Sequence, residues 1–167
     1  MKPLCIAFLV LLTGCATLQT QVEINAPAKD VRAILYDFAD YPKWNPYLVR
    51  VDGEPELGRE VYVTVKLEGK PEITGDVTIT SATDGLLSWR GSALSQVEAG
   101  TISVGVPGIL TADHDFIIEE LGPDKTLFRS NDKLSGALVP FYGDKLVTAA
   151  LDAMNDALKK RAEGLNK

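Results

Sequence analysis

Apolar and polar residues alternate along most of the chain between residues 47 and 134, and this period of two is typical of half-buried strands. Residues 60–67 are the clearest case, because Val61, Val63 and Val65 fall on one face. Strands are also predicted at 22–24, 47–51, 72–82, 86–91, 109–121 and 126–134. Short turns that contain glycine join several of them, which predicts an antiparallel meander.

A helical period replaces the alternation at two places. Residues 28–38 follow Pro27 and carry an apolar stripe at spacings of three and four, which predicts a short N-terminal helix. A longer stripe over roughly 143–163 predicts a C-terminal helix. A long amphipathic helix must bury its stripe against a face of the sheet. We therefore predict an α+β fold in which a curled six-to-seven-stranded antiparallel sheet wraps around the C-terminal helix.

The first fourteen residues have the pattern of a secretory signal. A charge at Lys2 precedes an apolar run of nine residues at 4–12, and small residues follow it. As a helix this run would reach about 14 Å, whereas a bilayer core requires roughly 30 Å, so it is too short for a stable membrane span. The sequence LTGC at 12–15 resembles the lipobox of bacterial lipoproteins. That resemblance implies removal of residues 1–14 and lipidation of Cys15; the alternative is an ordinary signal peptide with a chance cysteine.

Residues 15–21 would then form a lipidated tether before a single domain at 22–164. About six residues span at most roughly 20 Å, so the domain is expected close to the bilayer surface. Together these features predict a lipid-anchored protein of the bacterial cell envelope. Alanine rather than aspartate at position 16 resembles the pattern for sorting to the outer membrane, on its periplasmic face, if the host is Gram-negative.

Charge and composition exclude several classes of function. The chain carries a net charge of −6, and removing Lys2 with the signal leaves −7, which argues against nucleic acid and against electrostatic docking on anionic lipid. Of the two cysteines, Cys5 leaves with the signal and Cys15 is lipidated, so no disulfide is expected. With a single histidine and no free thiol, a zinc site of the His/Cys type is excluded, and neither a metal nor a cofactor is predicted.

The domain contains several short motifs. They are DYPKWNPY at 40–47, Leu57-Gly58 before EVYVTV, LSWRG at 87–91, HDF at 114–116, SNDKLSGALVP at 130–140 and AMNDALKKRAE at 153–163. As a set they resemble the START-like superfamily, the polyketide cyclase/dehydrase and lipid-transport group also called SRPBCC, over residues 22–164. The resemblance implies the helix-grip fold, with a hydrophobic ligand held between the curled sheet and the long helix. Some members of that group are cyclases or hydrolases, and many have no known activity.

Strand parity predicts which side chains line this cavity. If Phe116 faces inward, His114 and Ala112 share its face. A turn centred near residue 123 pairs positions whose numbers sum to about 246, which sets His114 opposite Asp132 with Cβ atoms ~5 Å apart. The predicted ligand-binding set is Trp89, Ala112, His114, Phe116, Phe128, Ser130, Asp132 and Met154.

The predicted pair of His114 and Asp132 leaves more than one function open. A carboxylate-oriented imidazole can act as a general base or bind the polar head of a ligand, or the carboxylate can simply satisfy a buried histidine. Ser130 is the only nucleophile that parity brings near, which makes a weak triad. We favour a membrane-anchored domain that binds a small hydrophobic or amphipathic molecule. The alternatives are a cyclase, dehydratase or hydrolase that uses this pair, and a protein-interaction module of the envelope.

A cavity below about 300 Å³ would disfavour both small-molecule interpretations. Residues 92–108 are predicted to form a hairpin-like flap at the cavity entrance. The aromatic residues of 41–47 are predicted to close one end of the sheet as a plug, in which the Asn45 side chain caps the turn. Asn155, in the middle of the C-terminal helix, is predicted to reach a backbone group of the first helix or of the plug.

Overall fold

The computed structural model describes residues 14–92, 111–136, 139–142 and 144–164. The strands are β1 (Gly14–Ile24), β2 (Leu48–Asp52), β3 (Glu60–Val65), β4 (Ile73–Ala82), β5 (Leu86–Ser92), β6 (Thr111–Gly122) and β7 (Lys125–Gly136). The helices are α1 (Ala28–Tyr36), the 3-10 helix η1 (Phe38–Lys43), α2 (Val139–Tyr142) and α3 (Asp144–Gly164). The flap predicted at 92–108 lies, apart from its first residue, outside the described residues.

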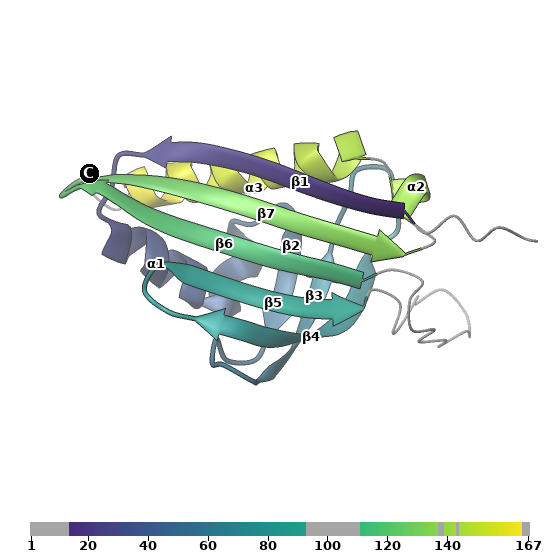
Figure 1. Cartoon of the computed structure of the whole chain (residues 1–167). Coiled ribbons are helices and arrows are strands. Elements are labelled where there is room, and N and C mark those ends of the chain that lie inside the picture. The colour runs from purple at the N-terminus through teal and green to yellow at the C-terminus, as the bar shows by residue number, and fades with distance from the viewer. Residues whose placement is uncertain (1–13, 93–110, 137–138, 143, 165–167) are drawn as a thin grey trace, which may run out of the picture.

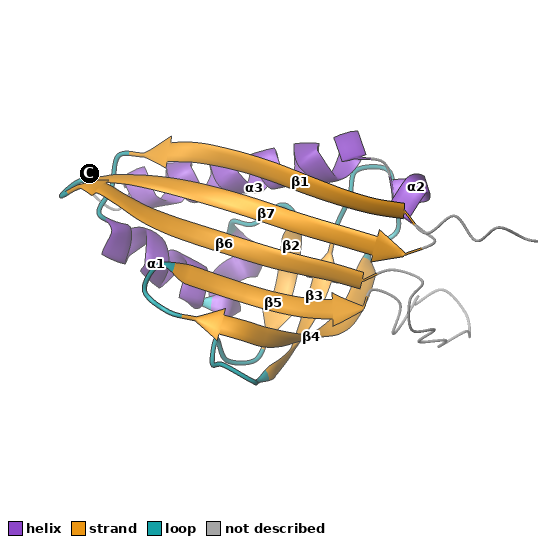
Figure 2. Ribbon diagram, in the orientation of Figure 1, coloured by secondary structure: helices purple, strands orange, loops and turns teal. Residues whose placement is uncertain are grey.

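The seven strands form one antiparallel sheet in the order β1-β7-β6-β5-β4-β3-β2. The sheet curls, so that β2 and β3 lie behind β5 and β6 in Figure 1, and α1 and α3 lie inside the curl (Figures 1 and 2). The predicted α+β helix-grip fold is therefore confirmed. Among the helices described, none is long and apolar enough to cross a membrane.

The N-terminal strand is much longer than the sequence pattern predicts. β1 begins at Gly14 and pairs along its whole length with β7, so the residues expected to form a tether at 15–21 belong to the sheet. The reason is composition: Leu18 and Thr20 are buried, but the residues between and beside them are the polar Thr17, Gln19 and Gln21, which are exposed. The inward-facing Thr20 differs little in polarity from its exposed glutamine neighbours, so the sequence pattern alone does not predict a strand there. The pairing with β7 stabilises the strand instead.

The long helix covers only part of the concave face. α3 packs chiefly against β1, with fewer contacts to β7 and α1. Its inward stripe is completely or almost completely buried and consists of Val147, Leu151, Met154, Asn155, Leu158 and Ala162. α3 follows the β1 edge (Figure 2), and its main contacts with the sheet are with β1 and β7 rather than with β2, β3, β4 or β5.

Candidate functional site

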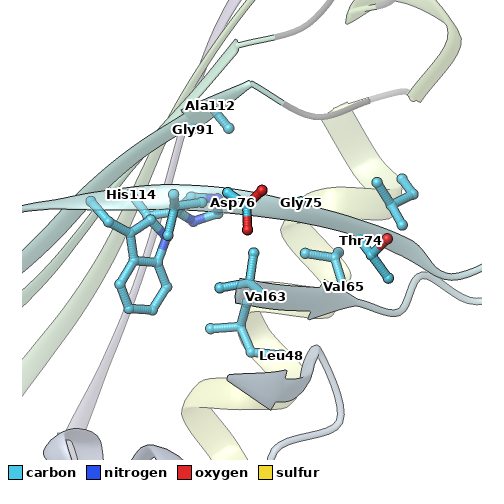
Figure 3. A pocket seen from close by; sticks show the side chains of 12 residues that line it. Leu48, Val63, Val65, Thr74, Gly75, Asp76, Gly91, Ala112 and His114 are labelled. Carbon is cyan, nitrogen blue, oxygen red and sulfur yellow. The ribbon is translucent and has the colours of Figure 1, made fainter. Parts of the chain in front are cut away.

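A small hollow lies on the concave face, on the strands that α3 does not cover. Its volume is about 50 Å³, and side chains from β2 to β6 line it (Figure 3). The wall is almost entirely apolar and includes Leu48, Val63, Val77, Trp89, Ala112 and His114. None of the described residues of α3 lines it, which differs from the predicted cavity between sheet and helix.

Three small residues on neighbouring strands create the hollow. Gly75 on β4, Gly91 on β5 and Ala112 on β6 all line it, and Gly91 pairs with both Val77 and Ala112 in the sheet. A Cβ atom on Gly91 would overlap the side chain of Val77. Glycine at this position therefore leaves room for the Val77 side chain in the wall of the hollow.

His114 and Asp132 are paired across β6 and β7, as the turn predicted near residue 123 requires. The Nδ1 atom of His114 lies 2.5 Å from Oδ1 of Asp132, and the two side chains are 7% and 0% exposed. Neither of these two atoms has another partner among the described residues, so each depends on the other. The pair is thus a buried contact between an imidazole and a carboxylate, and the imidazole also lines the hollow.

The surroundings of this pair favour the charged imidazole. Burial is the largest influence on the pKa of His114 and lowers it, but the attraction and hydrogen bonding of Asp132, helped by the outward-facing Asp113 and Asp115, outweigh burial and leave the pKa raised. The hydroxyl of Tyr47 lies 3.5 Å from Oδ2 of Asp132. Burial, and then the negative charge of Asp132, raise the pKa of Tyr47 well above its usual value, so it stays protonated and donates.

Tyr47 is a site residue that sequence reasoning missed. The pattern assigns it to the aromatic plug, and no sequence signal relates position 47 to position 132. Its ring centroid lies 6.3 Å from that of His114. The predicted turn is confirmed, because Oδ1 of Asn45 accepts hydrogen bonds from the backbone nitrogens of Tyr47 and Leu48 at 3.0 and 2.9 Å. That turn orients Tyr47 toward the ion pair.

The predicted ligand-binding set divides into two groups. Trp89, Ala112 and His114 line the hollow. The other five are buried and do not line it, namely Phe116, Phe128, Ser130, Asp132 and Met154. These five lie where α1 and α3 pack against β6 and β7, so their side chains belong to the core beside the hollow, and their predicted contact with a ligand stays a prediction. Phe116 and Phe128 stack with centroids 6.1 Å apart.

Ser130 is engaged with the long helix rather than with the imidazole. Its Oγ donates to Oδ1 of Asn155 at 2.8 Å, and Nδ2 of Asn155 donates to Oγ1 of Thr20 at 2.8 Å. The predicted partners of Asn155 in the first helix or the plug are therefore wrong: it links α3 to β7 and β1. The weak triad also fails, since the hydroxyl proton of Ser130 points to an amide oxygen and not to His114.

The family model described as polyketide cyclase/dehydrase and lipid transport matches residues 16–163. The chain belongs to this family. Solved structures with the same fold include a START superfamily protein from Mycobacterium smegmatis, with 24% identity, a TM-score of 0.67 and coverage of 91% of this chain and 99% of the other. The Zhui aromatase/cyclase of Streptomyces has 16% identity, a TM-score of 0.67 and coverage of 92% and 97%. A norcoclaurine synthase point mutant from Thalictrum flavum has 17% identity and a TM-score of 0.66, with coverage of 93% of this chain and 98% of the other. No match was found among curated proteins.

In this polyketide cyclase/dehydrase family domain, the pocket wall offers little chemistry beyond one imidazole. Within the described parts of the chain, no group of three or more His, Cys, Asp or Glu residues could hold a metal ion. His114 can orient a ligand or exchange a proton at Nε2, with Asp132 fixing the opposite nitrogen. A second and larger groove of about 270 Å³ lies between α3 and the end of β3; its lining includes Lys66, Glu68, Ala149 and Ala153.

Proposed function

We propose that the domain binds a small hydrophobic or amphipathic molecule, one end of which enters the hollow beside His114. The observation that carries this proposal is an apolar hollow, produced by Gly75, Gly91 and Ala112, in which the imidazole is the buried titratable group. The family description, which names lipid transport and polyketide cyclisation, agrees with such a ligand. The volume of about 50 Å³ is well below the criterion of about 300 Å³ given above, which disfavours a ligand enclosed as a whole, so the proposal is limited to a molecule of which only one end enters the hollow.

The test is native mass spectrometry, together with solvent extraction, of the protein purified from its own membrane. The wild type is expected to carry a defined small molecule. Ala112→Phe fills the hollow and is expected to remove it, whereas Ala33→Phe, at an exposed position of α1, is the matched control and should retain it. Equal occupancy in both variants, or an empty wild type, would contradict the proposal.

Membrane attachment through Cys15 is the second part of the proposal. Cys15 is exposed and is the second residue of β1, where it pairs with Ser135. The adjacent residue of β1 begins a row of paired positions that crosses four strands, namely Ala16, Leu134, Ala112 and Gly91. Three strand spacings separate the two ends of this row, so the anchor would lie roughly 15 Å from the pocket. Because β1 leaves no slack between anchor and sheet, the pocket-bearing strand ends would face the bilayer, from which an apolar ligand can be collected.

Membrane fractionation tests the attachment. The wild type is expected in the membrane fraction with a mass increase on its N-terminal peptide. Cys15→Ala should abolish both, while Cys5→Ala, within the predicted signal, should change neither. An unchanged membrane fraction for Cys15→Ala would refute lipid anchoring and leave the pocket proposal untouched.

An enzyme that uses His114 and Asp132 is the second candidate. The observation in its favour is that the imidazole lines the hollow while a carboxylate holds its other nitrogen. Turnover of the molecule identified by mass spectrometry separates the two functions. Chemical change of that molecule in the wild type, and its absence in His114→Phe with binding retained, would select the enzyme.

A further inference from the structure

We infer that the ligand's buried end carries a neutral carbonyl oxygen, which accepts a hydrogen bond from the Nε2–H of His114. This rests on the proposed function and adds the chemical class of the group that the hollow selects. Among the described residues, four polar side chains line the hollow. Thr74 and Asp76 belong to the more exposed part of the wall, so the buried polar groups are Trp89 and His114.

Both of these buried groups are donors. An indole nitrogen can only donate. For His114, Nδ1 faces the carboxylate of Asp132, and Asp132 has no other ion-pair partner among the described residues. A buried carboxylate needs a counter-charge, so the imidazolium form is the one that balances the site. In that form Nε2 also carries a proton, and the described side chains provide no acceptor for it.

The charge of the site then distinguishes between acceptors. His114 and Asp132 together are neutral, Asp76 in the more exposed part of the wall adds a negative charge, and Asp113 and Asp115 add negative potential from the other face of the sheet. A ligand carboxylate would bring a second negative charge into an apolar wall without a second cation to balance it. A neutral carbonyl, as in a ketone, ester or amide, accepts the hydrogen bond without that cost. A ligand end with no acceptor leaves the Nε2–H without a partner.

Three probes of nearly equal shape separate these possibilities: acetophenone, isopropylbenzene and benzoate. They share a phenyl ring and differ only in the group that would meet His114. The ring nitrogens of His114 can be followed by ¹⁵N NMR without assignment, because it is the only histidine in the chain. Acetophenone is expected to shift the Nε2 resonance and to bind roughly tenfold to hundredfold more tightly than isopropylbenzene and benzoate.

Variants identify the source of the preference. His114→Phe keeps a ring and removes the donor, and is expected to bind acetophenone and isopropylbenzene equally. Since this change leaves the buried Asp132 without a counter-charge, the double variant His114→Phe/Asp132→Leu removes the ion pair as a unit and provides the same test if the single variant does not fold. Ala33→Phe should keep the wild-type preference.

The outcomes separate this inference from the proposed function. Equal binding of acetophenone and isopropylbenzene to the wild type would overturn the inference and leave an apolar pocket. Tightest binding of benzoate would overturn it in favour of an anion site. Binding of none of the three probes, with no effect of Ala112→Phe on the co-purified molecule, would overturn the inference and the proposed function together.

Discussion

The hydrogen-bonded link between α3 and the sheet supports a quantitative prediction. Thr20, Ser130 and Asn155 are 6%, 0% and 2% exposed, so water does not compete for their hydrogen bonds. Asn155→Ala removes both bonds at once and leaves one hydroxyl proton without an acceptor and one hydroxyl oxygen without its donor. Each such buried group costs about 1–3 kcal/mol, so the variant should lose about 2–6 kcal/mol of unfolding free energy.

The magnitude alone does not test the cause, because the smaller side chain also leaves a cavity. A triple variant tests the cause, because it replaces all three polar groups by apolar ones of similar size: Asn155→Leu, Ser130→Ala and Thr20→Val. If unpaired polar groups cause the loss, this variant should lie within about 1.5 kcal/mol of the wild type. Asp156→Ala, at the exposed neighbouring position of α3, should change stability by no more than about 0.5 kcal/mol.

Urea unfolding followed by tryptophan fluorescence and by far-UV circular dichroism measures these free energies. Coincident transitions by the two probes would support two-state analysis. The reasoning is refuted if the triple variant is as unstable as Asn155→Ala, since the loss would then not arise from unpaired groups. It is equally refuted if Asn155→Ala unfolds at the wild-type urea midpoint.

Two further predictions concern the site. The folded pKa of His114 is raised because Asp132 outweighs the opposing effect of burial, so the ion pair contributes fully to stability below the unfolded pKa of about 6.5 and loses its contribution as pH rises through the folded pKa. The urea midpoint of the wild type should therefore fall as the pH rises above about 6. A fall of the same size in the double variant His114→Phe/Asp132→Leu would exclude the pair as its source. Gly91→Ala should cost about 1–3 kcal/mol because its Cβ overlaps Val77, whereas Gly122→Ala meets nothing within 4 Å and should be nearly neutral; equal thermal midpoints for the two would contradict the packing argument.

Local sequence signals were sufficient where side-chain period and turn chemistry decide the structure. The period of two predicted most strands to within a residue or two, and a turn at 122–125 fixed the register that brings His114 opposite Asp132. Parity also predicted that Trp89 faces inward, and it is 1% exposed. These properties depend on neighbours in the chain or on one hairpin, so a single sequence contains them.

Properties that depend on distant segments were missed. The length of β1 depends on β7, more than 100 residues away, because among the inward-facing Ala16, Leu18 and Thr20 only Leu18 is strongly apolar. The division of the predicted binding set depends on where α3 crosses the sheet, which its amphipathic stripe does not specify. The contact of Tyr47 with Asp132 likewise joins residues 85 positions apart.

The two buried polar groups of the concave face have different relations to the pocket. The Asn155 side chain makes its hydrogen bonds to Ser130 and Thr20 within the fold and does not line the hollow, so holding α3 against the sheet is sufficient to account for it. The pair of His114 and Asp132 is different. Apolar residues of similar size would often stabilise a fold as well as a buried ion pair does, so stability does not explain it. Its Nδ1 contacts a carboxylate and its ring lines the hollow, which is consistent with the proposed contact between His114 and a ligand.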